Sequence, residues 1–333
     1  MKMSLNIIQF FYIVLIISTL YDKITAGTDL IIHYTGRKDT MAEKPDRYNL
    51  WLTQLFGTAN PKIHKVNKHY GSPEKSYEAI SGGDHSTLDK NEKQRLEYVT
   101  IDKADRWLDY CDKTGISVCS LGAPEYPKLL AEIYDPPSIL FYRGDLSCLD
   151  VLSLTFVGTR KPSDYILKLC SRITRDIGRL GITLVSGMAH GVDQCVHTAC
   201  VNNGLPTVGV LACGIDVDYP YGSKVLREKI IMNGGAYMSE VLPNTPTSPE
   251  AFNPRNRILA GLTRGTAIFQ AAMNSGSLIT ASYALDEGRD VFCVPPPELF
   301  SPAYDGVSGF LDDGAIPIFN HDDILKEYVG IYI

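Results

Sequence analysis

Apolar runs alternate with amphipathic stretches through the second half of the chain, from about residue 151 to residue 320. Each apolar run is short and nearly continuous, which is typical of a strand that is buried on both faces of a parallel sheet. The strands are predicted over residues 151–158, 182–187, 206–214, 236–240, 265–272 and 290–296, and the helices over 163–180, 191–204, 224–235, 255–265 and 275–289. Strands that alternate with helices predict a Rossmann-like, doubly wound, mostly parallel α/β sheet over residues 151–320.

The sequence before this region divides into two further parts. Residues 46–100 carry apolar positions at helical spacing, separated by Gly and Pro, which predicts a small helical (SAM-like) module. Residues 101–150 contain two apolar runs on either side of a Pro-containing turn and a short helix, and we expect a linking α/β segment there. Residues 321–333 are expected to form a C-terminal tail that begins with a short helix.

The first 45 residues are predicted to be an N-terminal extension. Lys2 precedes the apolar run IIQFFYIVLIISTLY, which is typical of a signal peptide or a short membrane anchor but is too interrupted for a secure spanning helix. Met41 opens MAEKPDRYNLWL, so the other interpretation is upstream sequence included by a misassigned start codon. Because nothing downstream is typical of an exported protein, we expect a cytoplasmic protein with no membrane partner. The signal-like residues 1–40 leave a membrane or exported location as the alternative.

Composition places the chain among globular proteins, since 44% of the residues are hydrophobic, 21% are charged and the net charge is −6. None of the eight cysteines forms a C-x-x-C pair, so neither a zinc site nor a redox dithiol is expected. The chain has no G-x-G-x-x-G after the first strand, no Walker motif, no nucleophile elbow and no cluster of carboxylates. These observations argue against dinucleotide chemistry, ATP hydrolysis and a metal-dependent nuclease. We therefore expect no cofactor, no metal and no catalytic residue.

Residues suited to binding anions gather directly after the predicted strands. The carboxyl ends of parallel strands meet at one edge of the sheet, which is where ligands of such sheets bind. The candidates are Gly158, Arg160, Lys161, Ser186, Gly187, His190, Gly191, Lys224, Arg255, Asn256, Arg257, Ser275, Gly276 and Ser277. Guanidinium groups and the N–H groups at helix N-termini suit phosphate oxygens. Two glycine-serine helix starts in one sheet favour a strand of nucleic acid, or a nucleotide with several phosphates, over a single small anion.

Some of these residues also have structural interpretations. Ser186 and Ser277 are suited to capping helices, and His190 fits a hydrogen bond to the loop backbone as well as a ligand contact. Arg255 and Arg257 lie on different faces of one predicted helix, so we expect one to contact the ligand and the other the protein. Asp193 falls at a helix start, where a carboxylate is favoured by the helix dipole, and is expected to be structural.

Several ordered motifs resemble the DNA-processing protein A family, also called DprA or Smf. They are VGTRKPSDY, SGMAHGVDQCVHTA, GVLACGIDVDYP, MSEVLP, FNPRNRILAGLTRG, SGSLITASYALDEGRDVFCVP and DGAI, within a similarity that extends from about residue 46 to residue 328. The resemblance implies a Rossmann-fold homodimer in the cytoplasm that binds single-stranded DNA without enzymatic turnover. It also implies that the protein protects incoming DNA and loads the RecA recombinase onto it during natural transformation.

The resemblance also assigns roles to residues. Arg160 and the loop over residues 186–191 would grip backbone phosphates, and the candidates in 255–256 and 275–277 would line the same groove. The family has a basic residue after its Tyr-Pro pair, where this chain has Tyr221. The missing contact would be replaced by base stacking on Tyr221 or supplied by Lys224, one helical turn further on.

An enzyme of the related nucleotide-processing Rossmann group, such as a phosphoribohydrolase, is the alternative function. That group carries a PGGxGTxxE loop whose Glu performs the chemistry. Here NGGAYMSE lies elsewhere in the predicted fold, and the later strand ends in Gln270. A binding protein is therefore the expected class.

Overall fold

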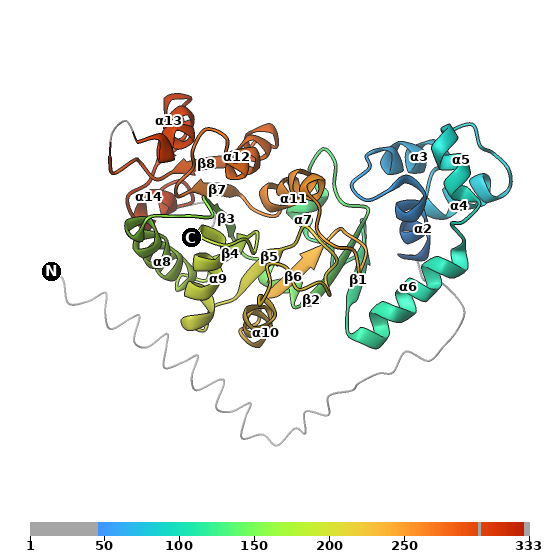
Figure 1. Ribbon diagram of the computed structural model, residues 1–333, viewed down its shortest axis with the longest axis horizontal. Coiled ribbons are helices and arrows are strands. Elements are labelled where there is room, and N and C mark those ends of the chain that lie inside the picture. Colours follow the sequence, from blue (N-terminus) through green and yellow to red (C-terminus); the bar gives the residue numbers. More distant parts are fainter. Residues whose placement is uncertain (1–45, 299–300, 330–333) are drawn as a thin grey trace, which may run out of the picture. The chain divides into compact units, whose positions relative to one another are not determined.

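The computed structural model describes residues 46–298 and 301–329, which form one compact unit (Figure 1). The predicted extension over residues 1–45 and the last four residues of the C-terminal tail lie outside the described residues. Among the described residues, no helix is both long enough and apolar enough to cross a lipid bilayer.

One sheet of nine strands runs through the described part of the chain. The strands are β1 (Ser117–Ser120), β2 (Ile139–Gly144), β3 (Ser153–Val157), β4 (Thr183–Ser186), β5 (Thr207–Val210), β6 (Ala236–Ser239), β7 (Gly265–Ile268), β8 (Asp290–Cys293) and β9 (Ile316–Pro317). Their order is β1-β2-β6-β5-β4-β3-β7-β8-β9. The pairs from β6 to β9 are parallel, whereas β2 pairs antiparallel with both β1 and β6. The predicted Rossmann-like, mostly parallel sheet is confirmed.

Helices cover both faces of the parallel part. Figure 1 shows α8 (Asp164–Gly178), α9 (Val192–Asn202) and α10 (Lys224–Met232) on one face and α11 (Pro249–Gly261) and α12 (Gly276–Asp286) on the other. The short elements are α7 (Lys128–Ala131), η1 (Leu146–Leu149), η2 (Pro302–Tyr304), α13 (Asp305–Asp312) and α14 (His321–Leu325). The predicted helical module over residues 46–100 contains α2 (Asp46–Phe56), α3 (Lys62–Tyr70), α4 (Pro73–Ser81) and α5 (Lys90–Leu96), and α6 (Ile101–Thr114) opens the predicted linking segment.

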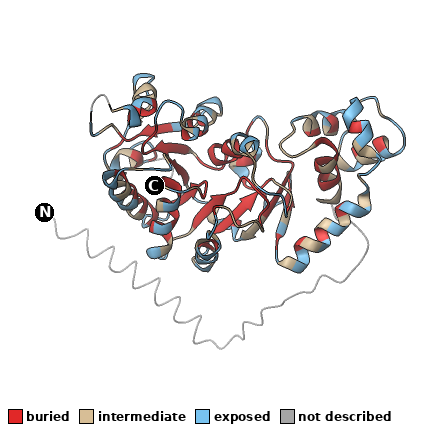
Figure 2. Ribbon diagram, viewed as in Figure 1, coloured by how far each residue is buried: buried red, intermediate tan, exposed pale blue. Residues whose placement is uncertain are grey.

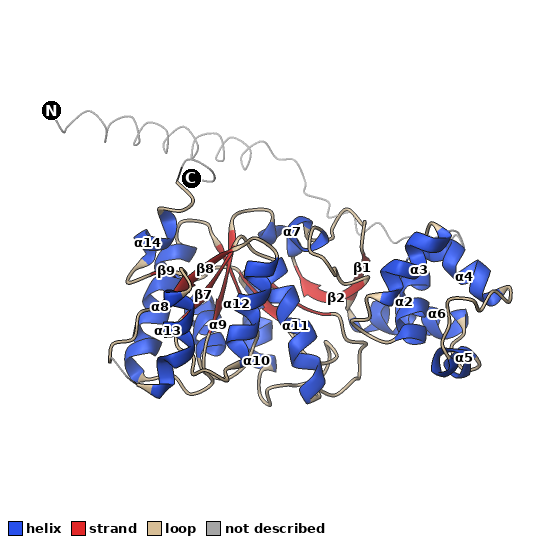
Figure 3. Cartoon of the chain, turned by 90° about the horizontal axis from the view of Figure 1, so that it is seen from above, coloured by secondary structure: helices blue, strands red, loops and turns tan. Residues whose placement is uncertain are grey.

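The chain reverses direction across the sheet between β3 and β7. From β3 it winds through β4 and β5 to β6 (Figure 1), and α11, labelled in Figure 3, then returns it to β7, on the other side of β3. Such a switch point leaves a crevice beyond the carboxyl ends of the two diverging strands, which is where ligands bind in sheets of this kind. The topology therefore places the ends of β3 and β7 at the centre of the candidate site.

Two elements differ from their predicted extent. Helix α11 begins at Pro249 rather than at residue 255, because proline is tolerated in the first turn and the helix accommodates Pro254 in its interior. The sheet extends beyond the predicted residues 151–320, because the linking segment over residues 101–150 supplies β1 and β2, which continue the same sheet past β6. The boundaries between the parts of the chain stay a prediction.

Helix α8 forms where its sequence predicts it. The Ser163 hydroxyl accepts a hydrogen bond from the N–H of Ile166 and so caps the first turn. Ile166, Cys170 and Ile173 recur at helical spacing and are fully or almost fully buried against the sheet. The opposite face of α8 is exposed to solvent, as Figure 2 shows in pale blue.

The hydrophobic core has three clusters, and one of them joins the helical module to the sheet. In this shared cluster Leu50, Leu52 and Trp51 of α2 pack in the same group as Phe141 of β2 and Tyr237 of β6. The other two clusters lie beneath α11 and α12 and beneath α8 and α9. Because the module and the sheet share buried side chains, neither completes its core without the other.

We predict that Phe141→Ala lowers the free energy of unfolding by about 3–5 kcal/mol, since it removes a fully buried ring and leaves a cavity. The two tryptophans, Trp51 and Trp107, lie in α2 and α6, so their fluorescence reports on the helices before the sheet. In urea, the midpoint measured by fluorescence should equal the midpoint measured by far-ultraviolet circular dichroism, in the wild type and separately in the variant, and both probes should show a lower midpoint for the variant. Leu285→Ala, at an exposed position on α12, is the control and should change stability by about 0.5 kcal/mol or less. Separate transitions for the two probes would contradict a shared core.

Candidate functional site

The loop after β3 carries two exposed basic residues, Arg160 and Lys161. The Thr159 N–H donates a hydrogen bond of 2.7 Å to the carbonyl of Gln270, which joins this loop to the end of β7 across the switch point. The Arg160 guanidinium lies over the ring of Phe252, with its Cζ 5.2 Å from the ring centroid. An arginine stacked on an aromatic ring keeps its N–H groups available at the ring's edge. Arg160 is therefore held in place and remains exposed.

The loop between β4 and α9 packs directly against this backbone. Gly191 has a φ of +85°, and a Cβ atom there would lie 2.3 Å from the Thr159 carbonyl oxygen, so only glycine fits. The next N–H, that of Val192, donates to the same carbonyl at 3.2 Å. His190 is exposed at the tip of the loop, and its Nδ1 lies 3.4 Å from the Gln194 side chain. The predicted clustering of these two loops at one edge is therefore present.

The loop before α9 already binds a carboxylate of the chain itself. The Ala189 N–H donates to Asp193 Oδ2 at 3.3 Å. Burial raises the pKa of Asp193 to about 6, although Arg255 and the loop N–H groups act in the opposite direction. Ser186, the first residue of the motif, is buried and donates its hydroxyl to the Phe156 carbonyl at 2.7 Å. Asp193 and Ser186 thus shape the loop from inside.

Arg255 ties two strand ends together. Its side chain is buried, and its Nη1 donates to the carbonyls of Gly187 at 2.6 Å and of Val210 at 2.7 Å. A Cβ atom on Gly187 would lie 2.2 Å from that Nη1 and 2.7 Å from Asp193 Oδ2, so the absence of a side chain at this position lets the arginine approach. Arg255 therefore positions the loops after β4 and β5.

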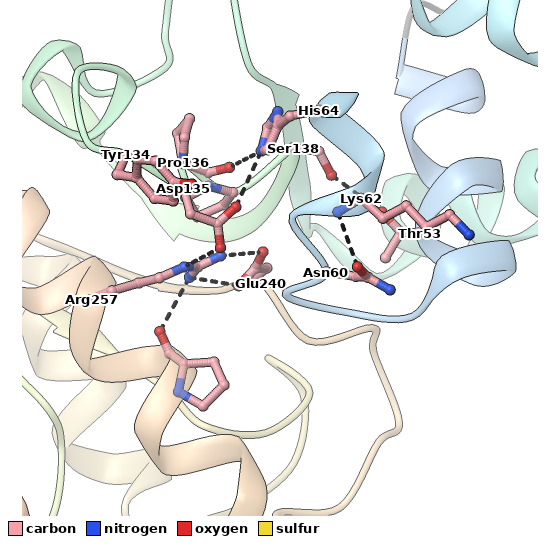
Figure 4. A network of polar contacts seen from close by, with 12 residues as sticks. Thr53, Asn60, Lys62, His64, Tyr134, Asp135, Pro136, Ser138, Glu240 and Arg257 are labelled. Carbon is pink, nitrogen blue, oxygen red and sulfur yellow. Dashed lines mark hydrogen bonds and ion pairs between the residues drawn. The ribbon is translucent and has the colours of Figure 1, made fainter. Parts of the chain in front are cut away.

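Arg257 belongs to a separate buried network, drawn in Figure 4. Its Nη1 and Nη2 each lie 2.9 Å from an oxygen of Glu240, and its Nε lies 3.2 Å from Asp135. Burial raises the pKa of Glu240, whereas the Arg257 guanidinium lowers it. Asp135 also lies 3.6 Å from His64 of α3, which contacts the Pro136 carbonyl at 2.7 Å. The network therefore connects α11 to the helical module.

The two arginines expected to divide between ligand and protein are both bonded to protein. Both residues are only 7% exposed. The contact of one of them with a ligand stays a prediction, and this geometry favours a supporting role for each.

The N-terminus of α12, the second predicted anion site, is held next to α11. Asn256 donates its side-chain N–H to the Gly276 carbonyl at 3.2 Å. The Ser275 hydroxyl accepts from the N–H of Ser277, and the two hydroxyl oxygens are 2.7 Å apart. Gly276 is exposed, whereas Ser277 and Asn256 are buried. The exposed part of this helix start is therefore Gly276 together with the preceding loop over residues 272–274.

The start of α10 presents an aromatic and a basic side chain to solvent. Tyr221 is 93% exposed, and Lys224 is exposed one turn along. Asp218 accepts from the Gly222 N–H at 3.0 Å and from the Ser223 hydroxyl at 3.2 Å, which fixes the turn that carries Tyr221. The structure therefore leaves both residues proposed for the contact after the Tyr-Pro pair open to a ligand.

The predicted site residues thus fall into two sets at one edge of the sheet. The exposed set is Arg160, Lys161, His190, Tyr221, Lys224 and Gly276, and the buried set is Ser186, Gly187, Arg255, Asn256, Arg257 and Ser277. Gly158, Gly191 and Ser275 are half-buried between them. A Cβ atom on Gly158 would lie 2.6 Å from the Val192 side chain, which explains the glycine at the end of β3.

Phe252 is the residue of this site that sequence reasoning missed. Besides Arg160, it contacts Arg255 at 6.0 Å and the ring of Tyr219 at 6.0 Å between centroids. Phe252 precedes Arg255 by three residues, which is the spacing of neighbours on one helical face. That spacing becomes informative only once α11 is known to begin at Pro249.

Groups of metal-ligand type and cysteine thiols are the remaining features with chemical potential in the described residues. The residues that the structure describes include no group of three or more His, Cys, Asp or Glu side chains placed to hold a metal ion. All eight cysteines are free thiols, and six of them are buried. Burial raises the pKa of Cys111, Cys119 and Cys293 to about 12, so these thiols are neutral.

The fold and the site together define a Rossmann-like protein whose strand-end loops carry exposed basic and aromatic residues on a buried arginine scaffold. The sequence model of the family described as "DNA recombination-mediator protein A" matches residues 117–329. The chain belongs to this family, and the resemblance inferred from its motifs is confirmed.

Relatives and solved structures agree with that assignment. The chain is 37% identical over 288 residues to the DNA processing protein DprA of Streptococcus pneumoniae (strain ATCC BAA-255 / R6), which covers 86% of this chain and 99% of the relative. It is 36% identical over 226 residues to the DNA processing protein DprA of Bacillus subtilis (strain 168), which covers 68% of this chain and 75% of the relative.

The X-ray structure of DNA processing protein A (DprA) from Streptococcus pneumoniae matches with a TM-score of 0.73 and 31% identity, covering 84% of this chain and 97% of that chain. A structure of DNA processing protein A from Helicobacter pylori, described as giving insight into its unique single-stranded DNA binding mode, matches with a TM-score of 0.58 and 29% identity. It covers 66% of this chain and 97% of that chain.

We predict that Asp193→Asn changes how stability depends on pH. The carboxyl pKa is raised from 3.8 to about 6 by folding, so the folded protein holds the proton more tightly between these values. Burying the charged form therefore lowers stability above pH 6, and this cost disappears as the pH falls toward 4. The stability of the variant relative to wild type should decrease by up to about 3 kcal/mol from pH 7 to pH 4. Urea unfolding at several pH values measures the difference, and a constant difference would contradict the assignment.

Proposed function

We propose that the protein binds single-stranded DNA along the carboxyl edge of its sheet. The observation that carries this proposal is Arg160, which is exposed at the switch point and held over the ring of Phe252, beside the start of α9. A guanidinium group fixed by stacking suits a phosphate of a nucleic-acid backbone. Lys161 and Lys224 provide further exposed positive charge at the same edge.

The distribution of charge and aromatic surface supports a single strand as the ligand. The chain has a net charge of −6, so its positive groups must act locally. Tyr221 is almost fully exposed beside Lys224, and an exposed ring next to cations is a common means of stacking an unpaired base. The Helicobacter pylori structure named for its single-stranded DNA binding mode supports the same ligand class.

We further propose that binding occurs without turnover. The side chain of Gln270, where the alternative nucleotide-processing enzymes carry a catalytic Glu, is buried and accepts a hydrogen bond of 3.1 Å from the Ser163 N–H. Of the two buried carboxylates at this edge, Glu240 is paired with Arg257 and Asp193 holds a loop N–H. These arrangements support a structural role for the edge carboxylates.

The remaining elements of the proposed role follow from family membership. We propose that the protein acts in the cytoplasm as a homodimer, protects incoming single-stranded DNA during natural transformation and loads the RecA recombinase onto it. The family name, DNA recombination-mediator protein A, supports a role beside a recombinase.

We predict that Arg160→Ala weakens binding of an oligothymidylate by about tenfold at low salt, because one charge-assisted phosphate contact is lost. The slope of log affinity against log salt should decrease in magnitude by about 0.7, the value for one phosphate of a single strand. Gel shifts at several salt concentrations measure both quantities. Lys93→Ala, which removes an exposed lysine from α5, is the matched control and should leave both unchanged.

An unchanged slope for Arg160→Ala would remove this residue from the interface. Hydrolysis of a nucleoside monophosphate by the wild type, with no binding of unpaired oligonucleotides, would favour the enzymatic alternative.

We predict that Tyr221 and Lys224 contribute in different ways. Tyr221→Ala should weaken binding by about tenfold without changing the salt slope, since stacking of one base contributes about 1–3 kcal/mol. Lys224→Ala should decrease the magnitude of the slope of log affinity against log salt by about 0.7. Tyr98→Ala, at another exposed tyrosine, serves as the control. An effect of Lys224→Ala alone would assign the contact after the Tyr-Pro pair to the lysine.

A further inference from the structure

A surface groove runs between α8 and α9, from the edge described above along the two helices. It contains an open hollow of about 510 Å³, within the range of small-molecule sites of roughly 300–1,000 Å³. Pro162 and Gly191 line one end of the hollow, and they are neighbours in the chain of Arg160, Lys161 and His190 in the candidate interface. Helix α9 has 11 residues and is therefore roughly 16 Å long. The groove thus begins at the carboxyl edge of the sheet, where we propose that DNA binds, and leads toward the opposite edge.

The hollow has an apolar floor and an uncharged polar rim. Leu167, Cys195 and Ala199 contribute apolar surface, and the Cys195 thiol lies 3.4 Å from the Leu167 carbonyl. Gln194, Thr198 and Asn202 on α9 supply amide and hydroxyl groups around it. None of the lining residues is charged. An apolar floor with a few amide donors and acceptors suits a flat, neutral, hydrogen-bonding group such as a nucleobase.

The solvent face of α8 carries a ridge of positive charge beside this hollow. Lys168, Arg172, Arg175 and Arg179 recur at spacings of four, three and four residues, opposite the buried face of the helix. Asp176 pairs with Arg172 at 3.8 Å and with Arg175 at 2.8 Å, which neutralises part of the ridge.

The two ends of the ridge keep their positive charge. Lys168 has no ion-pair partner among the residues that the structure describes. Arg179 donates a hydrogen bond of 3.3 Å to the side chain of Asn203, which lines the far end of the hollow, and Arg179 forms no ion pair with a described carboxylate. In a chain of net charge −6, this ridge is a local concentration of positive charge.

We propose that a single strand of DNA held at the carboxyl edge continues into the α8–α9 groove, where one base enters the hollow and the α8 ridge contacts the phosphates. The inference rests on the proposed function and extends it to a second, adjoining subsite. The mixture of cations on one wall and neutral amides on the other matches the two parts of a nucleotide. The extra contacts are available only to a strand long enough to pass Gly191.

The test compares a short oligothymidylate of about 5 nucleotides with a longer one of about 15, the range of site sizes for single-strand binders. For the longer strand, the double variant Lys168→Ala, Arg179→Ala should show a salt slope whose magnitude is smaller by about 1.4 than that of the wild type. The same variant should bind the short strand with the wild-type affinity and salt slope. Thr198→Trp, which places a large side chain at the exposed rim, should reduce affinity for the longer strand toward that for the short one. Gln94→Trp on α5 is the matched control.

Alkylation of Cys195 gives a second measurement that does not depend on variants. Cys195 is half-buried, and it lines the hollow. The longer strand should slow the reaction of iodoacetamide with Cys195, whereas the short strand should not, as followed by mass spectrometry.

The possible outcomes separate the two proposals. Wild-type binding of the longer strand by both groove variants, together with unprotected Cys195, would overturn the groove subsite while leaving the edge site intact. Protection of Cys195 by a free mononucleotide but by neither oligonucleotide would also overturn it, in favour of a small-molecule site. If no oligonucleotide binds at all, both the subsite and the proposed function fail.

Discussion

The arrangement of the site depends on the buried guanidinium of Arg255. Its Nη1 holds the carbonyls of Gly187 and Val210, and its charge faces the buried carboxylate of Asp193. Removing one partner of such a buried pair commonly costs about 3–5 kcal/mol, because the other charge is left uncompensated. The loops after β4 and β5 therefore share one electrostatic anchor, and the start of α9 is set by it. These contacts lie directly beneath the loop that exposes His190.

The three arginines of the site differ in what their guanidinium groups contact. Arg255 and Arg257 are turned inward, one toward backbone carbonyls and the other toward Glu240 and Asp135. Arg160 faces solvent and is oriented by an aromatic ring rather than by a carboxylate. A guanidinium paired with a carboxylate has little to offer a phosphate, whereas one stacked on a ring keeps its donors available. Phe252 thus connects the buried scaffold to the exposed surface.

The helical module is part of the same construction. Its α2 shares a hydrophobic cluster with β2 and β6, and His64 of α3 reaches the carboxylate that pairs with Arg257. Through Arg257 the network joins α11, which also carries Phe252, Arg255 and Asn256. The position of the module and the geometry of the strand-end loops are therefore coupled through one helix (Figure 4).

The sequence by itself determined the class of fold and the edge at which the site lies. Alternating apolar strands and amphipathic helices leave few arrangements, and the carboxyl ends of parallel strands always meet at one edge. It also determined the family, through motifs in a fixed order. Only the tertiary structure decided which candidates face solvent, because Arg160, Arg255 and Arg257 have the same chemistry and differ only in their neighbours. Phe252 beneath Arg160, and Arg255 beneath the loop that carries Gly187, are contacts between segments far apart in the chain. The local pattern of residues does not encode such contacts, since they arise only when the sheet brings the loops together.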